Sequence, residues 1–163
     1  MKLNVVILIL SLTGLSWFQT SCKKPADEIQ PAPELNENGD TSSLVIQVKG
    51  LKNTNGKVNI ALYNSGSSFN NSNQAFKTAI VPINAIPLEI LFDSLPPGEY
   101  AFAVFHDENS NQNLDQNFLG IPKEGFGFSN NASGSFGPPS YENAKFNVPS
   151  QSRVTQLINL VFY

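Results

Sequence analysis

Oxygen-bearing side chains recur at alternate positions near the middle of this 163-residue chain. They stand where the first, third, fifth and ninth positions of a calcium-binding loop would stand: Asp107, Asn109, Asn111 and Asp115. The backbone carbonyl of Asn113 would supply the seventh position. Because every candidate ligand is an oxygen atom, the pattern favours calcium over other metals. Two of the side chains are carboxylates, so we expect a calcium site of modest affinity.

Residues 107–115 are here called the acidic loop. Two positions, one within this loop and one just after it, depart from the usual calcium pattern. The sixth position, commonly glycine for a sharp turn, is Gln112, and the twelfth, commonly a bidentate glutamate, is Phe118. Glu124 would replace that glutamate only where the following segment folds back. The alternative interpretation is an Asn- and Asp-rich turn that satisfies its own backbone without a metal. We take calcium as the working hypothesis.

The single histidine, His106, stands next to Asp107 and invites a catalytic interpretation. Neighbouring side chains on a strand point to opposite faces, however, so the two groups would not act together. The chain also contains no Gly-x-Ser-x-Gly nucleophile elbow. We therefore expect His106 to be a packed or hydrogen-bonded residue and the protein not to be an enzyme. A hydrolase using His106, Asp107 and Glu124 is the least favoured alternative.

A long segment, residues 118–141, follows the acidic loop and is rich in Gly, Asn, Ser and Pro. Segments of this length are often functional or are packed by their own side chains. Its aromatic residues include Phe126 and Phe128, which would either fix the segment to the domain or stack on a ligand. The alternative function is therefore a carbohydrate- or peptide-binding module whose ligand loop includes Glu124, Phe126 and Phe128.

Short runs with alternating apolar residues predict the elements that position these loops. We expect strands at 44–49, 58–63, 76–81, 88–92, 99–107, 144–148 and 154–162, with Gly, Pro, Asn and Ser clusters between them. The turn at 53–56 favours a hairpin between the first two strands. Tyr100, in a Leu-Pro-Pro-Gly-Glu-Tyr corner, is expected to hydrogen-bond to nearby backbone. The pattern predicts an all-β, about seven-stranded Greek-key sandwich, prealbumin-like or immunoglobulin-like.

The first residues predict export and a lipid anchor. A basic start and the apolar run 5–18 are typical of a signal peptide, because a spanning helix needs about 20 residues. The following Cys22 is the only cysteine, and the segment resembles a bacterial lipoprotein signal. We expect a signal peptide at 1–21, a lipidated Cys22, a disordered tether at 22–41 and a folded domain at 42–163. The protein would then be an exported lipoprotein anchored to a membrane, with the outer membrane preferred and the face left open.

Charge and cysteine content exclude several classes of protein. The formal net charge is −3 and no basic cluster stands out, so we expect no nucleic-acid partner. A single cysteine cannot form an intramolecular disulfide. The expected partners are the membrane, through the lipid anchor, and a glycan or protein.

Three stretches together resemble the bacterial domain-of-unknown-function 2141 family. They are residues 95–115, which contain the corner and the acidic loop, residues 119–130 and residues 138–146. Members commonly have Gly in the acidic loop where this chain has Ser110 and Gln112. The resemblance implies an exported β domain covering 42–163, with no assigned biochemical role.

Overall fold

The computed structural model describes residues 40–135 and 137–163. The predicted signal peptide, Cys22 and the predicted tether as far as residue 39 lie outside these residues. Across the described part of the chain, helices are too short or too polar to cross a membrane.

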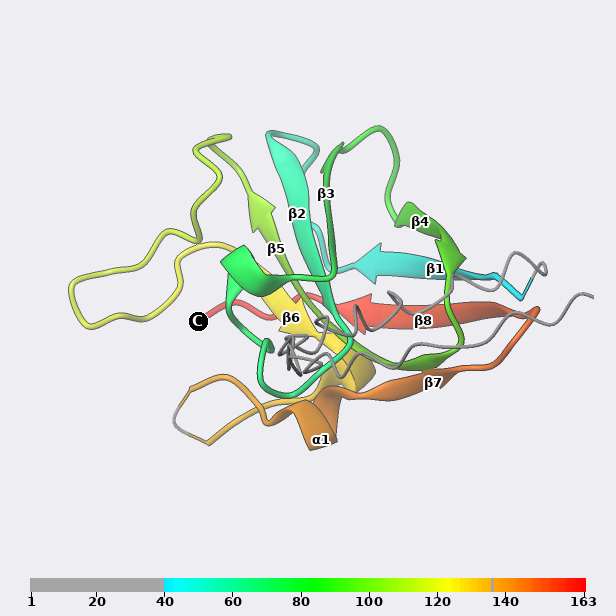
Figure 1. Cartoon of the computed structure of the whole chain (residues 1–163). Helices are drawn as coiled ribbons and strands as arrows, with labels where there is room; N and C mark the ends of the chain where they lie inside the picture. The colour runs from blue at the N-terminus through cyan, green and yellow to red at the C-terminus, as the bar shows by residue number, and fades with distance from the viewer. Residues whose placement is uncertain (1–39, 136) are drawn as a thin grey trace, which may run out of the picture. The chain divides into compact units, whose positions relative to one another are not determined.

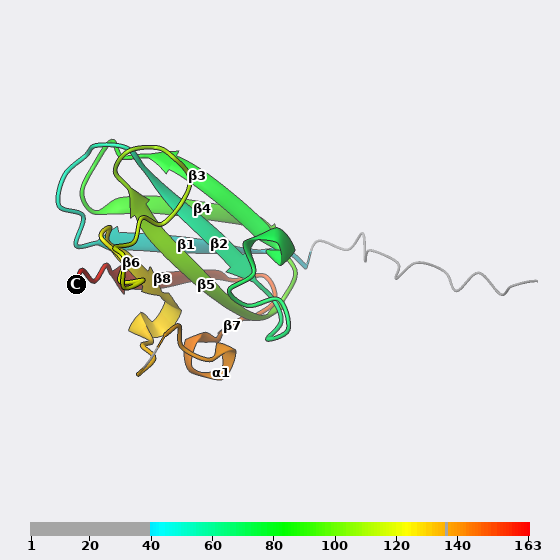
Figure 2. The same ribbon diagram turned by 90° about the vertical axis from the view of Figure 1, so that its left-hand side faces the viewer.

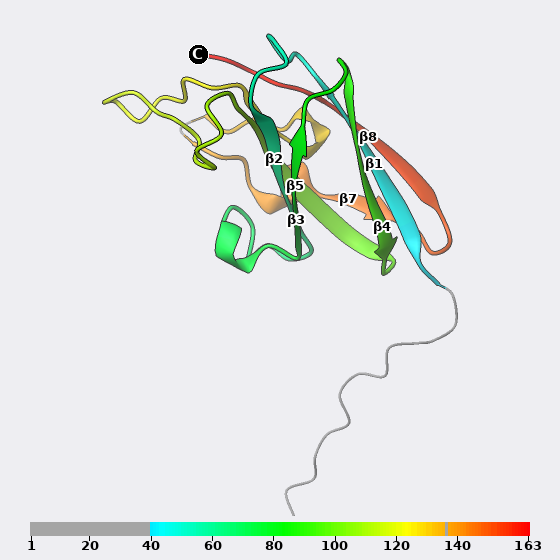
Figure 3. The ribbon, with the colours of Figure 1, turned by 90° about the horizontal axis from the view of Figure 1, so that it is seen from above.

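The described residues form eight strands in two sheets (Figures 1 and 3). One sheet has the order β4 (Leu88–Leu95), β1 (Ser42–Lys49), β8 (Arg153–Asn159). The other has the order β3 (Lys77–Pro82), β2 (Lys57–Tyr63), β5 (Gly98–Asp107), β6 (Phe126–Phe128), and β7 (Phe146–Val148) pairs with the beginning of β5. The pairing of β1 with β8 is parallel, whereas the other strand pairs are antiparallel. The prediction of an all-β sandwich is confirmed.

The core lies between the two sheets and follows the alternation of apolar residues along each strand. Each strand turns alternate side chains to one face, so the apolar set of β1 meets those of β2 and β5. These buried side chains are Leu44, Ile46 and Val48 from β1, Val58, Ile60 and Leu62 from β2, and Tyr100, Phe102 and Val104 from β5. Burial of such side chains contributes about 1.5–3 kcal/mol each, which makes this the main stabilising part of the domain.

The predicted hairpin between the first two strands is wrong. β1 and β2 belong to different sheets and face each other across the core, with residues 50–56 crossing between them. Gly56 has a positive φ of 66°, and a Cβ atom there would lie 1.9 Å from the Asp107 carbonyl oxygen. The glycine is therefore required by a close backbone approach rather than by a hairpin. An immunoglobulin domain keeps its first two strands in one sheet, so the order here differs from that alternative.

The long segment predicted after the acidic loop contains more regular structure than expected. It includes β6, a 3₁₀ turn (η2, Ser129–Asn131) and the first residue of a short helix (α1, Tyr141–Ala144). Strand β6 raises the count from about seven to eight, and a second 3₁₀ turn (η1, Ser72–Gln74) lies between β2 and β3. Ala144 ends α1 instead of beginning a strand, and β8 ends at Asn159 rather than at 162.

Two residues interpreted as structural are confirmed in that role. The Tyr100 hydroxyl donates to the Pro96 carbonyl oxygen at 2.7 Å. Burial raises the pKa of the Tyr100 phenol above its usual value. His106 is fully buried, and its Nε2 lies 2.8 Å from the Asn55 carbonyl oxygen. His106 is thus packed at the end of β5, as expected.

Strand register places the beginning of β1 and the acidic loop at opposite ends of the sandwich. Ser42 pairs with Leu95 next to the start of β5, whereas Lys57 pairs with Asp107 at the end of β5. In Figure 2 the described chain begins at the right-hand end, and the segment after β5 lies at the left. The acidic loop is therefore separated from the beginning of the domain by the length of β5, which has 10 residues.

Candidate functional site

The acidic loop is built on the Asp107 carboxylate. Asp107 is fully buried at the end of β5. Its Oδ1 accepts the Asn111 backbone N–H at 3.0 Å, and its Oδ2 accepts the Gln112 N–H at 2.8 Å and the Asn59 side-chain amide at 3.0 Å. A carboxylate has about four lone-pair sites, so these three donors leave one for another partner. Asp107 consequently folds the loop back over β2 and β5.

The remaining predicted ligands converge on Asp115. The amide nitrogen of Asn109 donates to Asp115 Oδ2 at 2.7 Å, and that of Asn111 donates to Oδ1 at 3.1 Å. The two amide oxygens accept the N–H groups two residues further on, at Asn111 and Asn113, over 3.0 and 2.7 Å. The structure thus brings the five predicted residues of the loop together. Their geometry includes the internally bonded turn that was the alternative to a metal site.

Gln112 adopts the backbone conformation that glycine usually supplies at this position. Its φ is 63°, and Ser110, two residues earlier, has a φ of 60°. A left-handed conformation costs a non-glycine residue roughly 1–2 kcal/mol. The loop therefore keeps the sharp turn expected of a calcium loop despite the missing glycine, and the Asp107 hydrogen bonds offset part of this cost.

Glu124 closes the loop from the other side. It is 5% exposed, and its two oxygens accept the backbone N–H groups of Glu108 and Asp115, each at 2.9 Å. The Lys123 N–H also donates to the Asp115 carbonyl oxygen at 2.8 Å. The following segment does fold back, as a replacement for the missing glutamate requires. In this structure Glu124 holds backbone amides, which makes it a clamp on both ends of the loop.

The convergence of these groups is not a preformed carboxylate cage. Within residues 40–135 and 137–163, three or more His, Cys, Asp or Glu side chains do not gather in an arrangement that could hold a metal ion. A cation in the acidic loop would use two carboxylates, at Asp107 and Asp115, together with amide and carbonyl oxygens. That donor set suits calcium, which takes neutral oxygen ligands readily.

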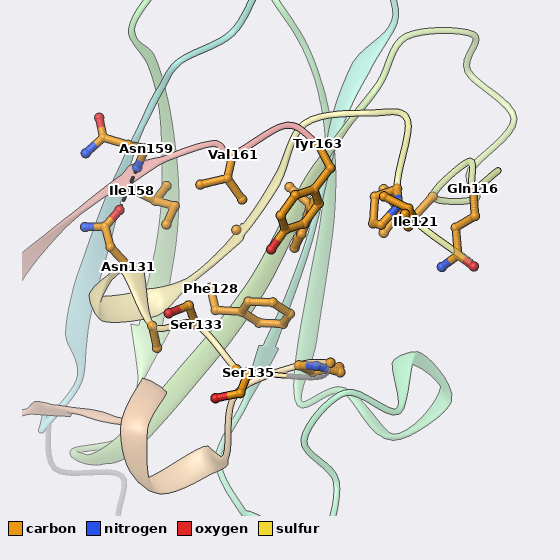
Figure 4. A pocket seen from close by; sticks show the side chains of 18 of the residues that line it. Gln116, Ile121, Phe128, Asn131, Ser133, Ser135, Ile158, Asn159, Val161 and Tyr163 are labelled. Atoms are coloured by element: carbon orange, nitrogen blue, oxygen red, sulfur yellow. Dashed lines mark hydrogen bonds between the residues drawn. The ribbon is translucent and has the colours of Figure 1, made fainter. Parts of the chain in front are cut away.

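A groove lies beside the acidic loop, between β6 and the end of the chain (Figure 4). Its volume is about 930 Å³, within the range of ligand pockets in proteins. Four segments contribute lining residues: Leu114, Gln116 and residues 120–122; β6; residues 131–135 and 137–138; and Ile158, Asn159, Val161 and Tyr163. In Figure 4 the side chains of Val161 and Tyr163 point toward Phe128. Phe126 and Phe128, predicted as ligand residues, both line this groove.

The aromatic residues of β6 also pack on rings from other segments. The ring centroid of Phe128 lies 6.2 Å from those of both Phe126 and Phe69, and the centroids of Phe126 and Tyr163 are 5.7 Å apart. Phe69 belongs to the loop after β2 and contacts Tyr141 at 5.7 Å. Such aromatic pairs stabilise the packing by about 0.5–1.5 kcal/mol each. The aromatic residues thus fix these loops to β6, as expected for a structural role, while part of each β6 ring remains half-exposed at the groove.

An ordered turn at the rim of the groove exposes two large apolar side chains. Phe118 is 94% and Leu119 is 68% exposed. The Asn117 side-chain oxygen accepts the Leu119 and Ile121 N–H groups at 2.9 and 3.0 Å, and its backbone pairs with Ile121 and Gly120 at 2.9 Å each. The turn is therefore held in shape by Asn117, although its apolar tip contacts little of the domain.

Sequence reasoning missed the C-terminal wall of the groove. Ile158 and Val161 were expected in the closing strand 154–162, and Tyr163 was given no role. Ile158 does lie in β8 and in the core, and all three residues also line the groove together with β6. Their contribution depends on a pairing of Phe126 with Val161, at 3.1 and 2.8 Å, between residues 35 positions apart in the chain. The two aromatic residues at the chain end, Phe162 and Tyr163, were the available signal.

These observations define a two-sheet β domain with an internally clamped acidic loop and an adjacent groove. The family model described as "Uncharacterized protein conserved in bacteria (DUF2141)" matches residues 46–156. The chain belongs to this family. Comparison with curated proteins and with solved structures gave no match.

Proposed function

We propose that the protein is a non-enzymatic, lipid-anchored module of the cell envelope whose acidic loop is ordered by calcium. The anchor rests on the signal-like start and on Cys22, the single cysteine of the chain. Two or more acyl chains hold a protein firmly at a membrane, whereas one alone is marginal. The outer membrane is the proposed location.

The observation that carries the calcium proposal is the convergence of side chains on Asp115. Asn109 and Asn111 both contact its carboxylate, and Asp107 anchors the same turn from below. Each amide oxygen has two lone pairs, so it can accept a backbone N–H and also face a cation. Calcium would neutralise the two carboxylates and draw these oxygens to about 2.3–2.6 Å from one ion.

Thermal unfolding of the full chain with calcium and with chelator tests this proposal. Extracellular calcium modules have Kd values of about 10⁻⁴–10⁻³ M. A tenfold excess of calcium over Kd then stabilises the folded state by about 1.4 kcal/mol. For a domain of this size the melting temperature rises by roughly 4–7 °C.

Two matched variants make the calcium experiment specific. Asp115→Asn keeps the shape of the side chain but removes a charged ligand, so we expect the calcium shift to shrink. Asp93→Asn changes an exposed carboxylate on β4, and the shift should remain as in the wild type. Identical melting temperatures in calcium and chelator, or an equal shift in Asp115→Asn, would refute the calcium proposal.

The anchor has a separate test. Cells that express the wild-type chain should retain it in the membrane fraction, and Cys22→Ser should shift the chain that has lost residues 1–21 to the soluble fraction. Incorporation of a labelled fatty acid into the wild type and not into Cys22→Ser completes the measurement. Equal labelling of both chains would contradict lipidation at this residue.

A second candidate function is the binding of a carbohydrate or peptide, and the groove favours it. Its volume of about 930 Å³ and its aromatic lining are typical of ligand sites. Leu114, at the end of the acidic loop, and Gln116 and residues 120–122, which follow it, form one wall. Calcium in the loop would therefore also order a wall of the groove.

A further inference from the structure

The chemistry of the groove narrows the class of ligand. Among its described lining residues, every side chain is uncharged. A charged ligand leaves water at a large cost unless opposite charge or several hydrogen bonds compensate for it. Phosphates, nucleotides and acidic sugars therefore fit this lining poorly. The groove favours a neutral ligand.

The backbone beside the groove is already hydrogen-bonded, which disfavours an added peptide strand. Phe126 and Val161 exchange both of their backbone hydrogen bonds, at 3.1 and 2.8 Å. Asn131 accepts the Asn159 N–H at 2.8 Å and donates to the Leu157 carbonyl oxygen at 3.3 Å. A peptide that adds to a sheet needs unpaired edge groups of this kind. At these positions beside the groove, the backbone groups are already paired within the domain.

The two sides of the groove differ in polarity. Phe128, Val161 and Tyr163 form an apolar side with half-exposed or exposed surface. Ser133, Ser135 and Gln116 are exposed lining residues whose side chains join none of the hydrogen bonds within the described residues. Figure 4 shows Ser135 on the opposite side of Phe128 from Val161 and Tyr163, and Ser133 beside Phe128. An acyl chain would bury these two hydroxyl groups and the Gln116 amide without partners, at a cost for each.

We propose that the groove binds a neutral oligosaccharide. A sugar ring has an apolar C–H face, which can lie against Phe128 or Tyr163, and a hydroxyl edge, which can bond to Ser133, Ser135 and Gln116. It carries no charge and needs no free strand edge. This inference rests on the second candidate function, and it assigns the ligand class and the residues of that site.

Co-sedimentation with vesicles tests the assignment on the full chain. The lipidated protein is reconstituted in phosphatidylcholine vesicles and incubated with fluorescently labelled hexasaccharides of neutral β-1,3-glucan, β-1,4-glucan, α-1,4-glucan, β-1,4-xylan and α-mannan. Oligogalacturonate serves as the acidic probe, a labelled neutral apolar hexapeptide as the peptide probe and a fluorescent fatty acid as the acyl probe. We expect retention of one or more neutral hexasaccharides above protein-free vesicles.

Tyr163→Ala is the informative variant, because its side chain lines the groove and is 81% exposed. Loss of a stacking aromatic ring should weaken retention by about three- to tenfold. Phe118→Ala is the matched control: its ring is 94% exposed and lies outside the groove lining, so retention should be unchanged. Ser133→Ala should also lower retention, because it removes one hydroxyl of the polar side.

The outcomes separate this inference from the function on which it rests. Retention of the peptide or acyl probe that depends on Tyr163, without saccharide retention, would overturn the saccharide assignment and leave a binding module. Retention of the acidic probe alone would overturn it as well. If no probe is retained, the binding function and the saccharide assignment both fail, whereas the calcium melts remain a separate test of the acidic loop.

Discussion

Replacement of Glu124 by glutamine should loosen the acidic loop at two identified backbone groups. The carboxylate accepts the N–H groups of Glu108 and Asp115, each at 2.9 Å. Glutamine keeps one oxygen for one of these donors and turns an amide NH₂ toward the other. Glu124→Gln therefore removes one charge-assisted hydrogen bond, places two donors against each other and makes the remaining bond neutral.

The expected magnitude follows from these changes. A hydrogen bond to a charged group contributes about 1.5–3 kcal/mol, and a neutral one about 0.5–1.5 kcal/mol. One bond lost and one weakened give a loss of about 3 kcal/mol in the free energy of unfolding. The melting temperature should fall by roughly 9–15 °C. If the loop opens locally, water hydrates the freed amides, and the loss is then smaller than this value.

Amide hydrogen exchange is the decisive assay, because it reports on the two donors individually. We expect the Glu108 and Asp115 amides to exchange at least about tenfold faster in Glu124→Gln, while amides in the middle of β5 keep their protection relative to global unfolding. Glu142→Gln is the matched control. Its carboxylate is exposed and pairs with Lys145 at 2.9 Å, an interaction of about 0–1 kcal/mol.

Two results would contradict the role of Glu124 as a clamp on the acidic loop. If Glu124→Gln melts with the wild type and both amides keep their wild-type exchange rates, Glu124 does not hold the loop. Comparable losses in Glu142→Gln would show instead that the assay responds to any removed carboxylate.

Two further predictions concern the alkaline range and a close contact. Burial raises the pKa of Tyr100 above 10.0, so its stabilising contribution is present below that pH and is lost as pH rises through the folded-state pKa. Denaturant unfolding of Tyr100→Phe should show a free energy of unfolding lower by about 0.5–1.5 kcal/mol at neutral pH, because the Pro96 carbonyl loses its partner. Above pH 10 the stability of this variant should decline less than that of the wild type. An equal alkaline decline in both chains would contradict this. Gly127→Ala should cost about 1–3 kcal/mol in thermal melts, because its Cβ would lie 2.9 Å from Ile158 Cδ1, whereas Gly66→Ala meets ordinary contacts at 3.5 Å. Equal losses in both glycine variants would refute the packing explanation.

The strands could be predicted from sequence more readily than their partners. Alternation in 44–49 and 58–63 identifies an apolar face for each strand, and both faces are buried as expected. The same alternation fits two strands paired in one sheet and two strands facing each other across a core. Local turn residues suggested the first arrangement, whereas Gly56 serves a close approach to Asp107.

The acidic loop was predictable because its residues are close in sequence and its spacing is specific. Glu124 was considered only conditionally, since the fold of the intervening segment decides whether it reaches Asp115. The groove was harder to predict from the sequence. It needs β6 to pair with β5 and Val161 to pair with Phe126, and a three-residue strand with glycine at its centre carries little alternation.

The position of β1 has a mechanical consequence. This strand is central in its sheet, hydrogen-bonded to β4 on one side and to β8 on the other. It begins beside the start of β8, whereas the groove is lined by the end of β8 and the residues after it. A pull on the chain before Ser42, resisted by a ligand held at the groove, acts along the strand. Interstrand hydrogen bonds lie across that direction, so they are loaded together in shear rather than broken one after another. With the proposed lipid anchor before Ser42 and the proposed ligand in the groove, tension between them would load the strands of the domain in this direction.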